Sequence, residues 1–208
     1  MRRMSEITAQ QVSALRKVSG AGMMDAKRAL EESGGDLERA KDILREKGLA
    51  SAKKRSGRAT EQGSIGSYLH MQADRPVIGV LVELASETDF VAKSPEFQAA
   101  ANDIAMHVAA TRPRWIRRDE VPADALAKER DLIAAQARNE GKPEKVIEKI
   151  VEGKLNSFYE DNVLYDQDFI NPEKFEGTVG QMVEAMIAQM GENIGVNRMA
   201  RIGVGEAE

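Results

Sequence analysis

Residues 63–91 read GSIGSYLHMQADRPVIGVLVELASETDFV, and this stretch decides the fold of the chain. Its first part alternates apolar with other residues through Ile65 and Leu69, which is the pattern of a β-strand. The segment 73–76, Ala-Asp-Arg-Pro, predicts a turn. The segment 77–84 is almost wholly apolar and predicts a central strand with both faces covered. Together these patterns predict a β-hairpin.

The regions that follow supply the rest of a layer built on this hairpin. Ser94, followed by proline, is typical of a helix start, and apolar residues at helical spacing from Phe97 onward predict a core helix. Thr178 and Gln181 form a capping box that opens another apolar helix, and residues 194–204 alternate as a third strand. The predicted fold class is α+β, with a three-stranded antiparallel sheet and covering helices. A sheet this thin leaves an open face that invites a second copy of the chain.

The first fifty residues have the pattern of three short helices. The first helix starts at a capping box of Thr8 and Gln11. The three helices are expected to end at Gly20, Gly34 and Gly48. A bundle this small buries little area, so its spare apolar surface needs a partner. The shape of the bundle resembles the ubiquitin-associated fold.

The composition divides the chain into three parts. Residues 1–50 form the helical bundle, residues 51–62 are a basic linker, and residues 63–208 form the α+β core and dimerisation domain. The core includes a helical hairpin, 122–159, whose turn contains glycine and proline. The basic run of the linker suits contact with RNA, but no aromatic residue interleaves to stack a base. A solvated tether is the favoured interpretation, and no direct nucleic-acid contact is expected.

The overall composition excludes several classes of protein. The chain has 208 residues, a mass of 22.8 kDa and a net charge of −4. It contains no cysteine, which excludes disulfides, thiolate zinc sites and thiol catalysis and fits a reducing cytoplasm. No apolar run is long enough for a signal peptide or a membrane span, so neither secretion nor membrane contact is expected.

The inventory of reactive residues argues against an enzyme. The two histidines, His70 and His107, lie in no metal-binding spacing and are interpreted as structural. Glu87 and Asp89 have no third group beside them that would complete an acid–base site. The segment 20–22, Gly-Ala-Gly, follows a helix and lacks the lysine of a phosphate-binding loop. We therefore expect no catalytic residue, no bound metal and no cofactor.

The segment 88–91, Thr-Asp-Phe-Val, lies at the junction between the central strand and the core helix. A large apolar side chain beside a carboxylate, on a short connection held at both ends, suits insertion into another protein. In the alternative interpretation Phe90 packs inward and Asp89 helps to start the helix. The residues alone leave both interpretations open.

Met23 and Met24 pose a similar choice. Consecutive helical side chains point about 100° apart, so the two methionines cannot both face one narrow core stripe. Met23 falls on the stripe that continues through Ala26 and Leu30, and one methionine of the pair is expected to be spare. Methionine is flexible and polarisable, which suits a partner surface, and contact is favoured over a gap-filling role in the core.

Two segments of the sequence resemble the elongation factor Ts family, the guanine-nucleotide exchange factors of elongation factor Tu. Residues 15–30, LRKVSGAGMMDAKRAL, are similar to the N-terminal signature of the family, and residues 87–93, ETDFVAK, are similar to its second motif. The expected order of helices and strands agrees over essentially the whole chain. Ala26 and Ser86 stand where the family often has cysteine. The length resembles the short form, in which the sheet-bearing core occurs once and the protein forms a homodimer.

The resemblance implies a function in translation elongation without covalent chemistry. A member of this family binds elongation factor Tu in its GDP-bound and nucleotide-free forms and promotes GDP release by disturbing the Mg²⁺ and phosphate site. The residues implied to intrude beside that site are Thr88, Asp89, Phe90 and Val91. The residues implied to grip the nucleotide-binding domain of the partner are Arg16, Met23 and Met24.

Two other classes of function stand beside this one. The bundle of residues 1–50 could recruit another protein as an adaptor without exchange activity, which leaves the segment 88–91 unused. A hydrolase built on Glu87 and Asp89 predicts turnover of a small substrate, which we do not expect. Titration against elongation factor Tu that carries a labelled guanine nucleotide distinguishes exchange from adaptor activity.

Overall fold

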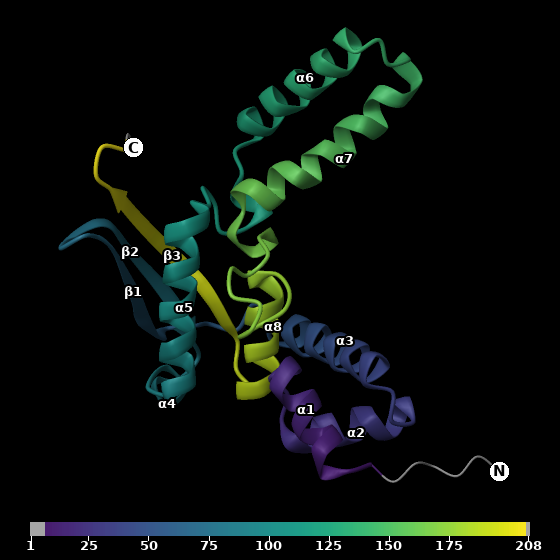
Figure 1. Ribbon diagram of the computed structural model, residues 1–208, viewed down its shortest axis with the longest axis vertical. Helices are drawn as coiled ribbons and strands as arrows, with labels where there is room; N and C mark the ends of the chain where they lie inside the picture. Colours follow the sequence, from purple (N-terminus) through teal and green to yellow (C-terminus); the bar gives the residue numbers. More distant parts are fainter. Residues whose placement is uncertain (1–6, 207–208) are drawn as a thin grey trace.

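The computed structural model describes residues 7–206, and the fold is α+β, as predicted. Figure 1 shows a sheet covered by helices, a helical bundle at the N-terminal end and a helical hairpin that projects at the opposite end. The strands are β1 (Gln62–Gln72), β2 (Arg75–Ser86) and β3 (Ile194–Gly203). The α-helices are α1 (Ala9–Ser19), α2 (Met23–Ser33), α3 (Leu37–Arg55), α4 (Asp89–Ala92), α5 (Pro95–Thr111), α6 (Ala123–Asn139), α7 (Glu144–Asn162) and α8 (Val179–Met190). Short 3-10 helices occupy Arg118–Glu120 and Leu164–Asp166.

The sheet is antiparallel with the strand order β1-β2-β3. β2 lies in the middle, which confirms the predicted central strand. β1 and β2 are joined by the two-residue turn of Ala73 and Asp74, in which Ala73 has a left-handed φ of 52°. The hairpin is therefore formed by neighbouring residues of the chain, whereas β3 reaches the sheet only after α8.

α5 covers one face of the sheet (Figure 1). Its start is set by Ser94, whose hydroxyl accepts the amide N–H of Phe97 at 3.3 Å, and by Pro95 in the first turn. Phe97 and Ile104 are fully buried against the sheet. The predicted core helix is therefore confirmed.

The approach of α5 to β1 is unusually close at Gly66. A Cβ atom built on Gly66 would lie 2.0 Å from the carbonyl oxygen of Ala101 and 2.2 Å from its carbonyl carbon. Both are backbone atoms, so no side-chain rotation could relieve the overlap. Glycine at this position lets the helix backbone rest directly on the strand.

α8 completes the main apolar core. Thr178 and Gln181 form the predicted capping box. The Thr178 hydroxyl accepts the backbone N–H of Gln181 at 3.2 Å, and the side-chain Oε1 of Gln181 accepts the backbone N–H of Thr178 at 3.1 Å. The buried face of α8 packs with α5 and β2 in one cluster. The buried residues that α8 contributes are Val179, Val183, Met186 and Ile187.

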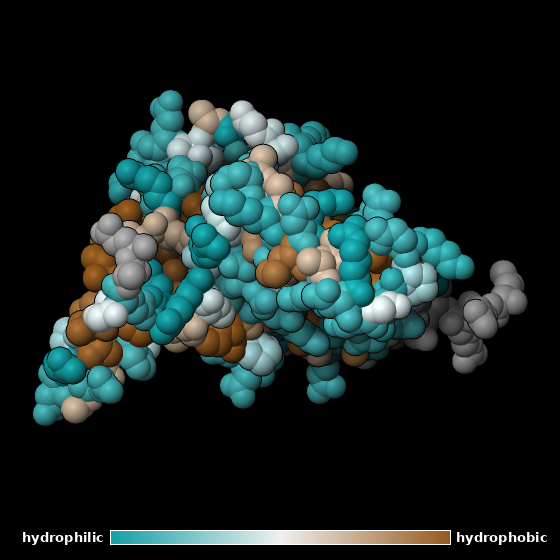
Figure 2. All heavy atoms as spheres, turned by 90° about the horizontal axis from the view of Figure 1, so that it is seen from above, coloured by the Kyte–Doolittle hydropathy of each residue, from teal (hydrophilic) through white to brown (hydrophobic). Residues whose placement is uncertain are grey.

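The opposite face of the sheet is open to solvent within one chain. The expectation of a thin, uncovered sheet is confirmed, whereas the expectation that β2 is covered on both faces is wrong at the level of one chain. Leu81 of β2 is 53% exposed and has diagonal apolar neighbours on both adjacent strands. Figure 2 shows apolar atoms gathered at the left of the view, on the sheet side of the molecule. The exposed apolar residues that define this open sheet face are Ile65, Leu69, Leu81 and Ile202.

α1, α2 and α3 form the predicted three-helix bundle around a small core of their own. The capping box of Thr8 and Gln11 is present at the start of α1. Gly20 and Gly34 end α1 and α2 with left-handed φ angles of 66° and 68°. The buried residues of the bundle are Leu15, Ala26, Ala29, Leu30 and Ala40.

The third helix was expected to end at Gly48, but α3 continues to Arg55. Residues 51–55, which were expected to begin a basic linker, are therefore helical. A glycine inside a helix costs only about 1 kcal/mol relative to alanine, and tertiary contacts outweigh this cost. Ala52 packs against the main core, and Nε of Arg55 donates to the carbonyl oxygen of Gly191 at 2.9 Å. The bundle is docked on α8 through α3 rather than held on a tether.

α6 and α7 form the predicted helical hairpin, which has its own apolar seam. Gly141 lies in its turn with a φ of 74°, and Pro143 precedes α7. α7 extends to Asn162, slightly beyond the predicted end of the hairpin. Across residues 7–206, none of the helices has both the length and the apolar composition that a bilayer span requires.

A buried polar network joins α5 to the segment after α7. His107 is fully buried, and its Nδ1 accepts the amide N–H of Ile170 at 3.2 Å. Nε2 therefore carries the proton and donates to Oε1 of Gln167 at 3.0 Å, and the Thr111 hydroxyl donates to the same oxygen at 2.8 Å. Burial lowers the pKa of His107, although the contact with Gln167 opposes this shift. The position fits the interpretation of His107 as structural.

Gly66→Ala is expected to destabilise the protein by about 2–3 kcal/mol, because the new methyl group would overlap the backbone of α5. Urea unfolding measures the change. Gly79→Ala on β2 is the matched control, because the nearest atom to a Cβ there lies at 3.4 Å, on the flexible side chain of Leu69. Equal losses of stability in the two variants would contradict the close approach.

The free energy of unfolding is expected to fall as the pH drops below about 6.5, the ordinary pKa of histidine. His107 has a lowered pKa in the folded protein, so the unfolded chain takes up the proton first and gains stability. The loss amounts to at most about 1.4 kcal/mol per pH unit from this group. Comparing urea unfolding of the wild type and His107→Gln between pH 7.5 and 5.5 isolates the effect, and identical slopes would disprove it.

Candidate functional site

The predicted segment 88–91 forms a short, firmly held corner between β2 and α5, which we call the tip. The hydroxyl of Thr88 caps α4 by accepting the N–H of Val91 at 3.4 Å. The hydroxyl of Ser86, at the end of β2, donates to the carbonyl oxygen of Thr88 at 3.0 Å. The tip therefore follows directly from the capping chemistry of the residues around it.

The tip presents one large side chain outward. Phe90 is 83% exposed, the largest exposed fraction among the large apolar side chains that the structure describes. Val91 and Ala92 point the other way and are buried in the main core. The alternative in which Phe90 packs inward is therefore wrong. The tip combines a buried anchor with an exposed aromatic ring, as a wedge for another protein requires.

Asp89 is exposed beside Phe90 and carries its charge in a fixed position. Nζ of Lys93, one turn later, lies 2.5 Å from Oδ2 of Asp89. The hydrogen bond and charge of Lys93 lower the pKa of Asp89, so the carboxylate stays ionised at neutral pH. Asp89 is also the first residue of α4, where a negative charge is favourable.

A second exposed surface lies at the turn between α1 and α2, and we call it the bundle patch. Met23 is 62% exposed and Met24 is 57% exposed, so the expectation that only one methionine of the pair is spare is wrong. Val18, near the end of α1, is also exposed, at 46%. Arg16 spans the turn, with Nε donating to the carbonyl oxygen of Ala21 at 3.3 Å. The residues of the bundle patch are Arg16, Val18, Met23 and Met24.

Val18 is the member of this patch that sequence patterns miss. It lies three residues after the buried Leu15, which is the spacing of a core stripe. α1 ends at the next residue, so Val18 lies beyond the edge of the bundle core although it continues the apolar spacing. No local signal distinguishes this case from an ordinary buried valine.

The tip and the bundle patch lie toward the same end of the molecule. In Figure 1, α4 and the turn between α1 and α2 lie in the lower part of the view, and the hairpin of α6 and α7 lies at the top. Both groups of residues that the sequence singled out from separate motifs thus lie away from the helical hairpin.

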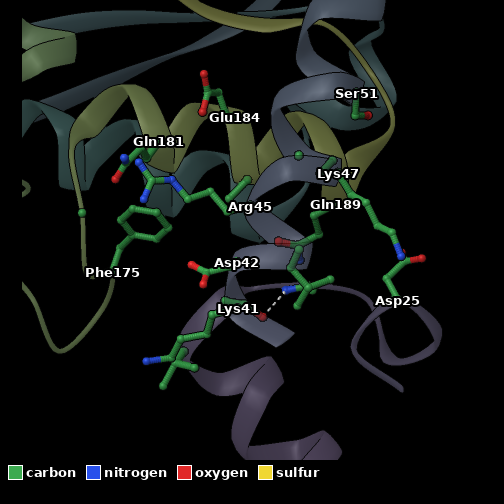
Figure 3. A pocket seen from close by; sticks show the side chains of 18 of the residues that line it. Asp25, Lys41, Asp42, Arg45, Lys47, Ser51, Phe175, Gln181, Glu184 and Gln189 are labelled. Atoms are coloured by element: carbon green, nitrogen blue, oxygen red, sulfur yellow. Dashed lines mark hydrogen bonds between the residues drawn. The ribbon is translucent and has the colours of Figure 1, made fainter. Parts of the chain in front are cut away.

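A cleft of about 540 Å³ lies beside the contact of α3 with α8 and is lined by the bundle, by residues 175–177 and by α8. Figure 3 shows Arg45 extending from α3 toward Phe175 and Gln181 across this cleft. Burial raises the pKa of Glu184, which lines the same space, and Arg45 opposes this shift. The lining mixes basic and acidic side chains, so it favours neither an anion nor a cation. Of the segment 20–22, Ala21 and Gly22 line this mixed surface rather than a phosphate cradle.

The part of the chain that the structure describes, residues 7–206, holds no group of three or more His, Asp or Glu residues placed to bind a metal ion. Glu87 and Asp89, the acid–base pair weighed above, form ion pairs with Arg58 and Lys93, respectively. Both carboxylates have lowered pKa values, so neither is suited to hold a proton at neutral pH. The arrangement suits recognition of a protein surface better than chemistry on a small molecule.

Comparison with known proteins supplies the family of the chain. The family model described as Elongation factor TS matches residues 6–176. The chain is 52% identical to an elongation factor Ts of Geobacter sulfurreducens over 201 residues, which cover 96% of this chain and 90% of the relative. It is 51% identical to an elongation factor Ts of Fervidobacterium nodosum over 201 residues, or 97% of this chain and 100% of the relative. An elongation factor Ts of Thermosipho melanesiensis is 50% identical over 200 residues, with 96% of this chain and 100% of the relative covered.

Proposed function

The chain belongs to the elongation factor Ts family of translation elongation factors, and we propose that it promotes the release of GDP from elongation factor Tu. Its partner is elongation factor Tu in the GDP-bound and nucleotide-free forms. It acts in the cytoplasm by binding alone, as a guanine-nucleotide exchange factor without covalent chemistry.

The observation that carries this proposal is the exposure of Phe90 at 83% on an anchored tip. Moving an aromatic ring from water into a cleft of the partner favours binding by roughly 1.5–3 kcal/mol. That amount corresponds to about one to two decades of affinity. The tip is held by Val91 and by its caps, so little of this free energy is lost in ordering it.

The proposed mechanism acts on the metal that holds the nucleotide. A GTPase binds GDP through phosphate contacts and through a Mg²⁺ ion that bridges phosphate oxygens and protein ligands. The tip enters beside this site, where Asp89 and Phe90 shift a helix of the partner so that the coordination shell of Mg²⁺ is lost. Thr88 and Val91 keep the two intruding residues in place.

The bundle patch supplies the second half of the contact. Arg16, Met23 and Met24 grip the nucleotide-binding domain of the partner, and the exposed Val18 extends the same apolar surface. Because the tip and the patch lie toward one end of the molecule, a single partner can contact both (Figure 1). Two joined contacts bind more tightly than either alone, since the second forms at high effective concentration.

Thermodynamic linkage makes the proposed effect reciprocal. This protein weakens the affinity of elongation factor Tu for GDP by some factor. GDP weakens the affinity of elongation factor Tu for this protein by the same factor. Binding of GTP, which is present at higher concentration, then refills the emptied site and releases the exchange factor. The cycle needs no catalytic side chain.

We further propose that the chain forms a homodimer through the open sheet face. Four apolar side chains, including Leu81 at 53% exposure and Ile202 at 77%, lie on one surface of three adjacent strands. Two such faces can pack together as a sandwich, which buries the side chains that α5 does not cover. The family resemblance to the dimeric short form points to the same face.

Phe90→Ala is expected to slow the release of labelled GDP from elongation factor Tu by about tenfold or more, because the variant loses the burial of the ring in the partner. Its thermal stability should stay close to that of the wild type, since the side chain is already in water. Stopped-flow release and a thermal melt measure the two effects.

Leu132→Ala is the matched control for Phe90→Ala. Leu132 is also exposed, at 52%, and lies on α6 of the hairpin, at the other end of the molecule. This variant should release GDP at the wild-type rate. Unchanged release with Phe90→Ala would remove the support for exchange and favour the adaptor function.

Leu81→Glu is expected to convert the proposed dimer into monomers, because it places a charge in the middle of the open sheet face. Sedimentation velocity should show a wild-type species of twice the chain mass of 22.8 kDa and a variant species of single mass. Leu132→Glu is the control, since Leu132 has nearly the same exposure, 52% against 53%. A monomeric wild type would refute the dimer.

A further inference from the structure

Glu192, in the turn between α8 and β3, lies against the tip. Its Oε2 accepts the amide N–H of Glu87 at 3.1 Å and the amide N–H of Thr88 at 3.0 Å. Its Oε1 accepts the hydroxyl of Thr88 at 2.5 Å. One carboxylate thus takes three hydrogen bonds from two consecutive residues at the base of the tip.

Glu87 makes the return contact. Its Oε1 accepts the amide N–H of Asn193 at 2.6 Å, and Nη1 of Arg58 lies 3.3 Å from the same oxygen. The hydrogen bond from Asn193, and then the charge of Arg58, hold the pKa of Glu87 below its usual value. Each glutamate therefore binds the backbone of the opposite segment. We call this pair of contacts, made by Glu87, Thr88, Glu192 and Asn193, the clasp.

The same turn is bound to the bundle side of the molecule. The carbonyl oxygen of Gly191 accepts Nε of Arg55 at 2.9 Å, and Nδ2 of Asn193 donates to the carbonyl oxygen of Arg58 at 2.8 Å. Both arginines belong to the end of α3 and the connection that follows it. Residues 191–193 thus link the tip to the helix that carries the bundle.

The clasp adds to the caps and the packing that already orient the tip. α4 has only four residues, and a helix this short is unstable on its own. Phe90 does not pack in the core, so Val91 and Ala92 are the residues of α4 that anchor it by packing. Hydrogen bonds to an ionised carboxylate are stronger than those between neutral groups, and they fix the backbone of Thr88 directly.

We propose that Glu192 is a positioning residue for nucleotide exchange. It holds the base of the tip so that Phe90 is presented in one orientation, in register with the bundle patch. This inference rests on the proposed function. It adds a residue outside both sequence motifs, 104 positions from Thr88 along the chain.

Amide hydrogen exchange in the free, full-length protein tests the contact itself. In the Glu192→Ala variant, the amide of Thr88 should exchange faster by about tenfold or more, because its acceptor is gone. Glu192→Gln should retain most of the protection, since its carbonyl oxygen can accept the same two N–H groups. Glu148→Ala, an exposed glutamate on α7, is the matched control and should leave the Thr88 amide unchanged.

Release of labelled GDP from elongation factor Tu, measured against the concentration of each variant, tests the role. Glu192→Ala should lower the maximal release rate by about tenfold, the equivalent of a lost hydrogen bond to a charged group. The half-saturating concentration should change by only about twofold, because the bundle patch still binds. Glu192→Gln should restore the maximal rate, and a thermal melt should show that both variants are folded.

Three outcomes would overturn the proposal. The first is full maximal release by a Glu192→Ala variant whose Thr88 amide has lost protection, because the tip then works without being held. The second is unchanged protection of Thr88 in that variant, which would mean that the clasp does not hold the tip. The third is failure of the wild-type protein to accelerate GDP release, which refutes the proposed function and the role of Glu192 within it. In that case the amide hydrogen exchange of Thr88 still reports whether the clasp exists.

Discussion

The packing of the α5 backbone directly onto β1 is the constraint on which the rest of the structure depends. At Gly66 the two backbones leave no room for a side chain. This contact fixes the distance between α5 and β1. The chain passes from the end of β2 to the start of α5 by a short route. That route is α4, and its geometry directs Phe90 outward while Val91 enters the core. The exposed ring thus lies on the short connection between the two elements that pack together in the core.

Within residues 7–206, apolar side chains remain exposed on the open sheet face, the tip and the bundle patch, and these surfaces differ in character. The open sheet face extends over three adjacent strands, which suits association with an equal surface. The tip and the bundle patch carry large, exposed side chains beside charges, which suit insertion into clefts of another protein. In the proposed function, this separation leaves the tip and the bundle patch available to a partner while the open sheet face serves the proposed homodimer.

Elements with strong local signals could be predicted from the sequence. The capping boxes at Thr8 and Thr178 appear where expected, because the residues that form them are three positions apart. The end of α3 was missed, since Gly48 is a weak helix breaker and the contact of Arg55 with Gly191 outweighs it. The exposure of both Met23 and Met24 was missed because the edge of a three-helix core cannot be located from one helix alone.

The sequence by itself determined the types and order of the elements and the place of the tip between a strand and a helix. Each of these depends on residues within a few positions of one another, where periodicity and capping act. Only the tertiary structure decided that Phe90 faces solvent, that one sheet face is open, and that Glu192 meets Thr88. Those facts depend on groups that are distant in the chain, and their meeting is settled by packing, which no local pattern encodes.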